Sequence, residues 1–383
     1  MSTPADLTLT PEERVARARA DLRIGAPVAL VDAEADGQAG ALVLAAETAS
    51  PARLAALAAM GAGTLDLALT HRRAETLMAR AYDGDLARVI LDGPDDGLRP
   101  RARDTAWIRA TADPSIDLAT PLKGPYPTRR EGDAGLHRLA LALVKQARLL
   151  PAVVVARWDD ATPAIDAARG AGLAVLDAAT VAGAAAAAVR MRRVSGARVP
   201  LRLSEAGRLH VFRPDDGGEE HYAVEIGRPD RGEAVLARLH SACFTGDVIG
   251  SLKCDCGPQL NAALEQIAAE GAGVLLYMNQ EGRGIGLANK MRAYALQDEG
   301  LDTVEANHRL GFEDDERDFR LGAAMLVAMG FSSVRLMTNN PGKIAMMDAC
   351  GVRVVERVAL RVGENPLNAR YLATKARKSG HLL

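Results

Sequence analysis

The chain has 383 residues, 48% of them hydrophobic and 25% charged, and a formal net charge of −2. This length allows two domains with hydrophobic cores of their own. The small net charge provides no broad positive field for nucleic acid or a membrane surface, and no apolar run reaches the roughly 18 residues of a membrane span. Residues 1–13 lack the pattern of a secretory signal. We therefore expect a cytoplasmic protein that binds neither nucleic acid nor a membrane.

The first half of the chain alternates strand-like and helix-like segments, as α/β folds do. Strands are expected at residues 27–31, 41–46, 63–69 and 151–156. Helices are expected at residues 51–60, capped by Ser50, and at 133–150, 161–171 and 180–192. Residues 193–200 contain a Ser-Gly pair and are expected to join two domains, residues 1–195 and 196–383. The expected fold class is α/β (α+β), with a mixed sheet and flanking helices in each domain.

The second half continues this alternation. Strands are expected at residues 201–211, 221–226, 234–240, 274–278, 333–338 and 352–360. Helices are expected from residue 257 to 271 or 273, at 287–299 and 316–329, and from the Asn340-Pro341 pair to about 351, with a loop at 302–308. The strand at 274–278 leads into a polar, glycine-rich loop. Because open α/β sheets bind ligands at the carboxyl ends of their strands, this loop is a candidate binding element.

Three of the four cysteines, Cys243, Cys254 and Cys256, lie in one short segment. Disulfides explain them poorly, because Cys254 and Cys256 are too close to pair comfortably and the cytosol is reducing. Zinc prefers thiolates, and a Cys-x-Cys pair with a third cysteine provides three corners of a tetrahedron. A catalytic zinc leaves the fourth position open for water, whereas His240 could close the shell of a structural zinc. The residues alone leave both interpretations open.

Four segments carry residues that suit an anionic ligand. The cysteine segment contains Arg238, Lys253 and Gln259, which can hydrogen-bond such a ligand beside the metal. The other three are the glycine-rich loop 281–286, the acidic run 314–318 that includes Arg317, and the strand-end loop 338–343. Taken alone, each of these also fits an ordinary turn, a helix N-terminus with favourable carboxylates, or a helix cap.

From about residue 201 to residue 383, the sequence closely resembles GTP cyclohydrolase II, the zinc enzyme that opens riboflavin biosynthesis. The resemblance rests on seven blocks in the same order and spacing. They are RLHSACFTGD at 238–247, KCDCG at 253–257, QEGRGIGL at 280–287, RAYALQD at 292–298, DTVEANH at 302–308, DERDF at 315–319 and TNNP at 338–341.

This resemblance implies hydrolysis of GTP to 2,5-diamino-6-hydroxy-4-(5-phosphoribosylamino)pyrimidine, formate and pyrophosphate. It places one Zn²⁺ per chain on Cys243, Cys254 and Cys256, where it activates water for attack at C8 of guanine. It also implies Mg²⁺ bound with the triphosphate and a homodimer.

Tyr294 falls on the family's tyrosine in the ring-opening chemistry. Arg317 falls on its proposed nucleophile toward the α-phosphate, and Asp315 on the proton acceptor. Because a guanidinium group is protonated at any working pH, stabilisation of the departing pyrophosphate is the milder role for Arg317. The residues implied to contact the nucleotide are Arg238, Leu239, His240, Ser241, Ala242, Gln259, Glu281, Gly282, Arg283, Thr303, Thr338 and Lys343. Ala242 departs from the family, which often has glutamate there.

The N-terminal region resembles, more faintly, dihydroxybutanone-phosphate synthase, the usual fusion partner of this enzyme. The similar segments are residues 22–32, 42–47 and 68–70. The acidic magnesium-binding loop of that family is replaced by DGQAGA at 36–41, and its Gly-His-Thr-Glu motif by GLHR at 135–138. Such a site cannot work without its carboxylates and base. We therefore expect residues 1–195 to be catalytically inactive and to serve stability, dimerisation or regulation.

Three other functions remain open at this stage. The chain could be a related cyclohydrolase that acts on another nucleotide or stops at a formylated intermediate. It could be a zinc-stabilised nucleotide-binding regulator without turnover. It could also be a bifunctional enzyme with a working N-terminal half.

Overall fold

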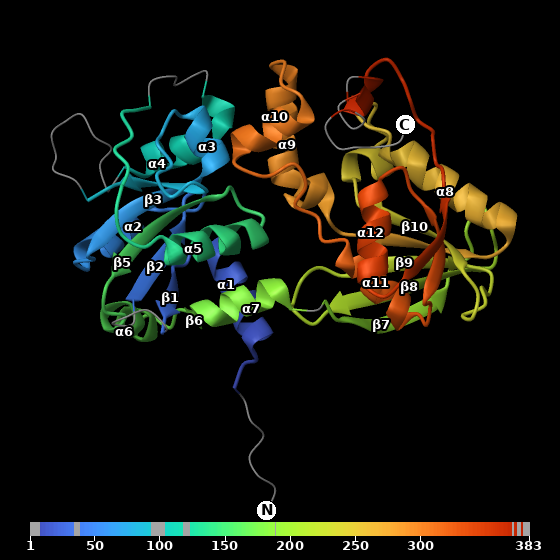
Figure 1. Ribbon diagram of the computed structural model, residues 1–383, viewed down its shortest axis with the longest axis horizontal. Coiled ribbons are helices and arrows are strands. Elements are labelled where there is room, and N and C mark those ends of the chain that lie inside the picture. Colours follow the sequence, from blue (N-terminus) through green and yellow to red (C-terminus); the bar gives the residue numbers. More distant parts are fainter. Residues whose placement is uncertain are drawn as a thin grey trace, which may run out of the picture. The chain divides into compact units, whose positions relative to one another are not determined.

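The computed structural model of this chain describes residues 8–33, 39–92, 104–117, 123–187, 189–369, 371–373 and 377. The chain forms two compact units, each built on one mixed sheet with flanking helices (Figure 1), which confirms the expected fold class. Unit 1 comprises residues 1–187, 291–299 and 305–313, and unit 2 comprises residues 188–290, 300–304 and 314–383. No helix among the described residues is long and apolar enough to span a membrane.

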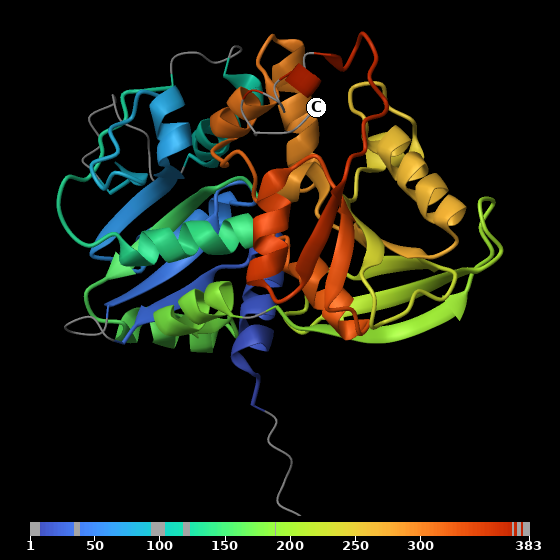
Figure 2. The ribbon, with the colours of Figure 1, turned by 45° about the vertical axis from the view of Figure 1, so that its right-hand side comes forward.

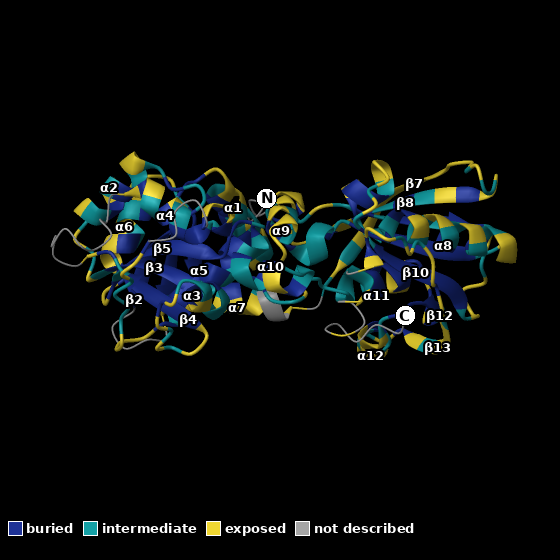
Figure 3. Cartoon of the chain, turned by 90° about the horizontal axis from the view of Figure 1, so that it is seen from above, coloured by how far each residue is buried: buried dark blue, intermediate teal, exposed yellow. Residues whose placement is uncertain are grey.

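Unit 1 has a six-stranded sheet in the order β4-β3-β5-β2-β1-β6. Its strands are β1 (Val28–Asp32), β2 (Ala39–Ala45), β3 (Thr64–Thr70), β4 (Leu86–Ile90), β5 (Ala152–Trp158) and β6 (Val175–Asp177). Only the β1–β6 pair of this sheet is parallel. The unit's N-terminal helices are α1 (Pro11–Arg23), α2 (Pro51–Ala59), α3 (His71–Thr76), α4 (Thr105–Ala112), α5 (Gly135–Gln146), α6 (Thr162–Gly170) and α7 (Ala178–Ala186). The core lies between the sheet and helices α1, α5 and α7, where Figure 3 shows the strands buried.

Two later helices, α9 (Leu287–Asp298) and α10 (Thr303–Leu310), contribute most of their residues to unit 1. Arg292 of α9 forms ion pairs with Glu47 at 2.9 Å and Asp113 at 3.0 Å. The loop after α10 is held in turn, because the Thr70 hydroxyl donates to the Gly311 carbonyl at 2.8 Å. Side chains from the start of the chain therefore fix a segment that lies more than two hundred residues later.

Unit 2 has a seven-stranded sheet in the order β13-β12-β10-β11-β9-β8-β7. Its strands are β7 (Met191–Arg198), β8 (Gly207–Pro214), β9 (His221–Ile226), β10 (Val235–Ser241), β11 (Gly273–Met278), β12 (Ser333–Met337) and β13 (Arg353–Val358). Helix α8 (Cys256–Glu270) covers one face, and α11 (Arg320–Ala328) and α12 (Pro341–Ala349) cover the other (Figure 2). Strands β10 to β13 are mutually parallel, so their carboxyl ends lie at one edge of the sheet.

Two expected segments differ from the structure. The helix expected to reach residue 192 ends at Ala186, and the expected linker 193–200 is mostly strand β7, which pairs with β8. This edge strand is largely exposed on both faces, so its sequence lacks the apolar alternation that marks a strand. The expected loop at 302–308 is mostly helix α10: the Asp302 carboxylate accepts from the amide of Val304 at 2.8 Å, and Ala306 and Leu310 are buried.

Smaller differences concern where elements begin. The strand expected from residue 201 begins at Gly207, because residues 201–206 form turns closed by a bridge between Leu201 and Ser204. The helix expected from residue 316 begins at Arg320. Of the loop at 36–41, residues 36–38 lie outside the described part of the chain.

We expect Arg73→Met to destabilise unit 1 by about 1–3 kcal/mol, because the buried carboxylate of Asp117 loses two hydrogen bonds but keeps its ion pairs with Lys123 and Arg309. The Arg73 guanidinium is 1% exposed and donates to both oxygens of Asp117, at 2.7 and 2.8 Å. Arg138→Met, which breaks the exposed pair with Asp85, should cost at most about 1 kcal/mol. Urea unfolding of the two variants measures both values, and equal losses would contradict the assignment.

Candidate functional site

The three clustered cysteines lie just beyond the carboxyl end of β10. After Ser241, the amide of Ala242 still donates to the carbonyl of Met278 at 2.7 Å, which keeps the chain beside β11. The chain then turns at Cys243 into the π-helical turn η2 (Phe244–Val248). Cys256 is the first residue of α8, and Cys254 lies two residues before it. All three sulfur atoms lie within 4.8 Å of one another, so the structure brings together the residues expected to bind the metal.

The geometry of the cysteine cluster fits a metal ion. The Sγ atoms of Cys243 and Cys254 are 3.7 Å apart. Tetrahedral zinc with Zn–S bonds of about 2.3 Å requires sulfur atoms about 3.8 Å apart. A Cβ atom on Gly246 would lie 2.8 Å from the sulfur of Cys254 and 3.2 Å from that of Cys243. Only glycine therefore leaves the space between these sulfurs free.

The protonation of the three thiols also favours a cation between them. Hydrogen bonds from Cys254 and Cys256, together with the charge of Lys290, hold the pKa of Cys243 well below its usual range, although burial opposes this. The hydrogen bond with Cys243 and burial raise the pKa of Cys254 to about 11, and the pKa of Cys256 is raised for similar reasons. Adjacent thiolates repel one another, so a bound divalent cation is what allows all three to ionise together.

His240 does not join this cluster. Its Nε2 atom is 3.0 Å from Asp247 Oδ2, which also accepts from the amide of Cys243 and the hydroxyl of Tyr277, each at 2.9 Å. Burial lowers the pKa of His240, although the carboxylate of Asp247 opposes this. Among the described residues, the group that could hold a metal contains only the three cysteines. The interpretation in which His240 closes a structural zinc site is therefore not supported.

Lys290 is a site residue that the sequence analysis missed. Its buried ammonium group lies 3.1 Å from the sulfur of Cys243, 2.8 Å from the hydroxyl of Thr245 and 2.9 Å from a carboxylate oxygen of Glu281. The other oxygen of Glu281 accepts from the amide of Phe244 at 2.6 Å. A positive charge near the start of a helix interacts unfavourably with the helix dipole. The position of Lys290 near the start of α9 is therefore the sequence signal that could have identified this residue.

The glycine-rich loop packs directly on the loop that carries Arg317. The amide of Glu316 donates to the carbonyl of Arg283 at 2.9 Å, and the Arg283 guanidinium donates to the carbonyl of Asp314 at 3.0 Å. A Cβ atom on Gly284 would lie 2.5 Å from the carbonyl oxygen of Glu316. The glycine is thus required by close backbone contact, as in a tight turn, and the contact fixes the loop before Arg317.

Arg317 and Asp315 form an ion pair beside the end of β10. The guanidinium donates to both carboxylate oxygens, at 2.8 and 2.5 Å, and a third nitrogen lies 3.4 Å from the hydroxyl of Ser241. Burial alone would lower the pKa of Arg317, but the partner carboxylate outweighs burial and raises it. For Asp315, burial is outweighed by the hydrogen bonds from Arg317, and the pKa of the carboxyl is lowered. Arg317 is therefore a fixed positive charge.

A second cation, Lys343, contacts the ring of Phe319. Its ammonium group is 4.8 Å from the centre of the Phe319 ring and donates to the carbonyl of Leu239 at 3.1 Å, while the Arg317 guanidinium is 4.7 Å from the same ring. The side chain of Leu239 belongs to the hydrophobic core, so only its backbone is available to a ligand. Two positive charges thus contact one aromatic ring at the edge of the sheet.

The remaining expected residues are placed less directly. The Arg238 guanidinium donates to the carbonyl of Met337 at 2.8 Å and to the side chain of Gln259, and burial lowers its pKa to about 10. The Thr338 hydroxyl accepts a hydrogen bond from the backbone amide of Asn340 at 3.0 Å. Thr303 is the first residue of α10 in unit 2. Tyr294 belongs to unit 1, and its role stays a prediction.

These features define an α/β protein with a three-cysteine cluster that could hold a metal ion and with basic side chains at the same sheet edge. The sequence profile of GTP cyclohydrolase II matches residues 192–359. A protein of Azospirillum brasilense named GTP cyclohydrolase-2 is 43% identical over 387 residues, which cover 100% of this chain and 98% of that protein. The chain belongs to the GTP cyclohydrolase II family.

Other comparisons cover one half of the chain or most of its length at low identity. A GTP cyclohydrolase-2 of Azotobacter vinelandii is 58% identical over 175 residues, covering 46% of this chain and 84% of its own length. The profile of 3,4-dihydroxy-2-butanone 4-phosphate synthase matches residues 16–83, so the fainter N-terminal resemblance is confirmed as well. The crystal structure of a two-domain 3,4-dihydroxy-2-butanone 4-phosphate synthase from A. baumannii aligns with this chain at 18% identity and a TM-score of 0.36. The alignment covers 90% of this chain and 99% of that one.

We expect Gly246→Ala to remove most of the metal, because the added methyl group would fill the space between the sulfurs. Purified protein should lose most of its complement of about one zinc per chain, measured by inductively coupled plasma mass spectrometry. Gly170→Ala, a helical position with open space around it, is the matched control and should keep its zinc. Full zinc occupancy in Gly246→Ala would contradict this account of the site.

Proposed function

We propose that this chain catalyses the zinc-dependent hydrolysis of GTP to 2,5-diamino-6-hydroxy-4-(5-phosphoribosylamino)pyrimidine, formate and pyrophosphate, the first step of riboflavin biosynthesis. The observation that carries the proposal is the cluster of three cysteine sulfurs within 4.8 Å, at the sheet edge that also holds the Arg317–Asp315 pair. Membership of the GTP cyclohydrolase II family supports the same conclusion, because a full-length relative is named GTP cyclohydrolase-2.

In this proposal Cys243, Cys254 and Cys256 hold the zinc ion. Zinc with three protein ligands supplies a Lewis acid and lowers the pKa of a coordinated water to about 7, the chemistry needed at C8 of guanine. Lys290 offsets the negative charge of the thiolates and holds Glu281 in place through its second contact. Asp247 fixes the first cysteine through its backbone amide.

Arg317 and Lys343 are proposed to bind the phosphates. Because the pKa of Arg317 is raised, its guanidinium stays positively charged and stabilises the departing pyrophosphate, which is the milder of its two expected roles. Asp315 then orients Arg317 and does not accept a proton from it. Mg²⁺ is proposed to bind mainly through the oxygens of the triphosphate.

Other roles follow from the family resemblance. Tyr294 is proposed as a proton donor or orienting hydroxyl in the ring-opening step. Glu281 has the right chemistry for the N1 and 2-amino donors of guanine, although its carboxylate here is bound to Lys290 and the amide of Phe244. Ala242 contributes no side chain to this chemistry. We also propose that the enzyme is a cytoplasmic homodimer. Light scattering after gel filtration measures the molar mass and so tests the oligomeric state.

Unit 1 is proposed to be catalytically inactive. At the position of the synthase motif, His137 is fully buried and lies 3.2 Å from Asp66, while Arg138 pairs with Asp85 on the surface. Asp66 is itself fully buried and pairs with Arg129 at 2.6 Å. These side chains support the sheet and are not free to abstract protons from a sugar phosphate.

The decisive assay incubates the purified protein with GTP, Zn²⁺ and Mg²⁺ and follows the diaminopyrimidine by absorbance, with formate and pyrophosphate measured in parallel. Equal amounts of the three products are expected. Pyrophosphate without formate, or turnover only with another nucleotide, would favour a related enzyme. Protein that binds zinc and GTP but releases neither product would favour a regulator.

We expect Arg317→Met to lower kcat/KM for GTP by about 10²–10³-fold, the usual effect of removing a donor that stabilises transition-state charge. Arg320→Met is the matched control, because Arg320 forms a similar but more exposed pair with Asp318, two residues before it. The control should change kcat/KM by less than about twofold. Both variants should keep their zinc, and equal activities would contradict the role given to Arg317.

We expect no dihydroxybutanone phosphate when ribulose 5-phosphate and Mg²⁺ are supplied, because the acidic loop and the base of the synthase are replaced. Coupled gas or liquid chromatography with mass spectrometry measures the product. Its formation at a rate comparable to formate release from GTP would show a bifunctional enzyme.

A further inference from the structure

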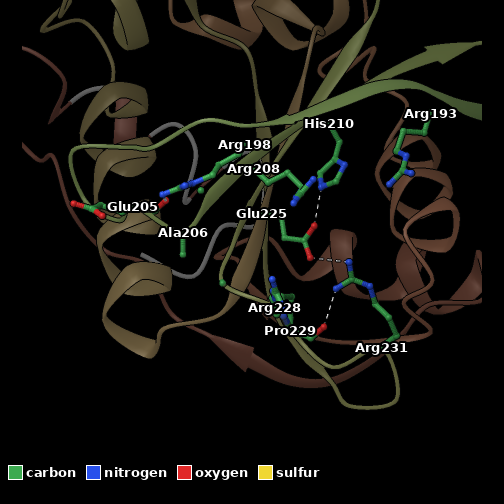
Figure 4. A pocket seen from close by; sticks show the side chains of 12 residues that line it. Arg193, Arg198, Glu205, Ala206, Arg208, His210, Glu225, Arg228, Pro229 and Arg231 are labelled. Atoms are coloured by element: carbon green, nitrogen blue, oxygen red, sulfur yellow. Dashed lines mark hydrogen bonds and ion pairs between the residues drawn. The ribbon is translucent and has the colours of Figure 1, made fainter.

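Unit 2 carries a second polar pocket that the proposed activity does not use. It has a volume of about 760 Å³ and is lined by residues of β7, β8, β9 and the turns next to them (Figure 4). Five arginines line it, together with one histidine and two glutamates, and we call it the arginine pocket. The arginines are Arg193, Arg198, Arg208, Arg228 and Arg231.

The arginine pocket lies at the opposite end of the sheet from the cysteines. It is bordered by the turn between β9 and β10, so it lies near Val235, where β10 begins, whereas the cysteines follow Ser241, where β10 ends. At about 3.3 Å per residue, the seven residues of β10 separate the two sites by about 20 Å. A ligand in this pocket is therefore not part of the proposed GTP site.

The arginine pocket contains a buried carboxylate, Glu225, with two charged or titratable partners. Glu225 is 5% exposed and accepts from Arg231 at 2.7 Å, and its other oxygen lies 2.7 Å from the imidazole of His210. Arg231 is fixed further by the carbonyl of Pro229 at 2.8 Å and by the ring of Phe331, 4.2 Å away. The one buried carboxylate is thus already neutralised, and it does not cancel the charge of the other arginines.

The rim of the pocket holds positive charges that folding does not explain. The side chains of Arg193, Arg208 and Arg228 are exposed and have no hydrogen bond or ion pair within the described part of the chain. Strand register places Arg208 directly opposite both Arg198 and Glu225, so two like charges face each other across β7 and β8. Like charges directly opposite each other destabilise a sheet, and a bound anion would relieve this repulsion.

The chemistry of the lining indicates which anion fits. Guanidinium groups bind phosphate through two parallel hydrogen bonds, and several of them favour a ligand with more than one phosphate. The volume is in the range of small-molecule sites, and Phe, Tyr and Trp are absent from the lining, whose one imidazole, His210, is buried against Glu225, so the lining favours phosphates over a nucleobase. We propose that the arginine pocket binds a small anion with two or more linked phosphate groups. The proposal does not rest on the proposed GTP chemistry.

The test is hydrogen–deuterium exchange of the full-length, zinc-loaded protein with and without inorganic pyrophosphate. Peptides covering residues 191–214 and 221–232 should be protected, independently of peptides covering residues 241–259. A parallel arm uses GTP with the Arg317→Met variant, to distinguish a free pyrophosphate from the phosphate chain of a nucleotide. Protection confined to residues 241–259, or none with either ligand, would overturn the proposal.

Two double variants that remove the same charge distinguish a specific binding site from general electrostatic attraction. Arg208→Gln combined with Arg228→Gln should weaken the protection, raising the apparent Kd for pyrophosphate by about tenfold or more. Arg192→Gln combined with Arg202→Gln removes the same charge from exposed residues outside the pocket and should leave the Kd unchanged. Zinc content shows that both proteins are folded. Equal losses in the two double variants would show diffuse attraction and contradict a site.

Discussion

The site depends on three cysteine sulfurs that are held closer together than three thiolates tolerate on their own. The backbone forces this arrangement: β10 delivers Cys243, the start of α8 delivers the other two, and Gly246 leaves the space between them free. Lys290 offsets only part of the charge. A divalent cation held by Cys243, Cys254 and Cys256 would resolve the conflict, and among the described residues the group that could hold it contains these three ligands.

The rest of the site follows from the parallel part of the unit 2 sheet. Strands β10, β11 and β12 all end at one edge, so the cysteines, the glycine-rich loop and Lys343 are neighbours there, although they lie far apart in the sequence. Close contact between Gly284 and Glu316 brings the loop with Arg317 to the same edge. The opposite end of the sheet carries the arginine pocket, so a single sheet separates the two regions proposed to bind anions.

Much of the fold and of the cysteine site could be predicted from the sequence, because the elements that form them have clear local sequence patterns. The buried strands are apolar, and the crowded cysteines have few explanations besides a metal. Strand β7 could not be predicted, because it is exposed and defined only by pairing with β8. The network of His240, Asp247 and Tyr277 depends on tertiary packing, and no spacing in the sequence reveals it. The position of Lys290 near a helix start is unusual in the sequence, but its contact with Cys243 follows only from the fold.

X-ray absorption at the zinc edge of the purified protein tests the central claim most directly, because it reports the ligands of the metal without relying on turnover. The account predicts three sulfur neighbours at about 2.3 Å and one lighter oxygen or nitrogen neighbour whose distance changes when GTP is added. A shell with fewer than three sulfurs, or a closed protein shell that includes an imidazole and does not respond to GTP, would contradict it.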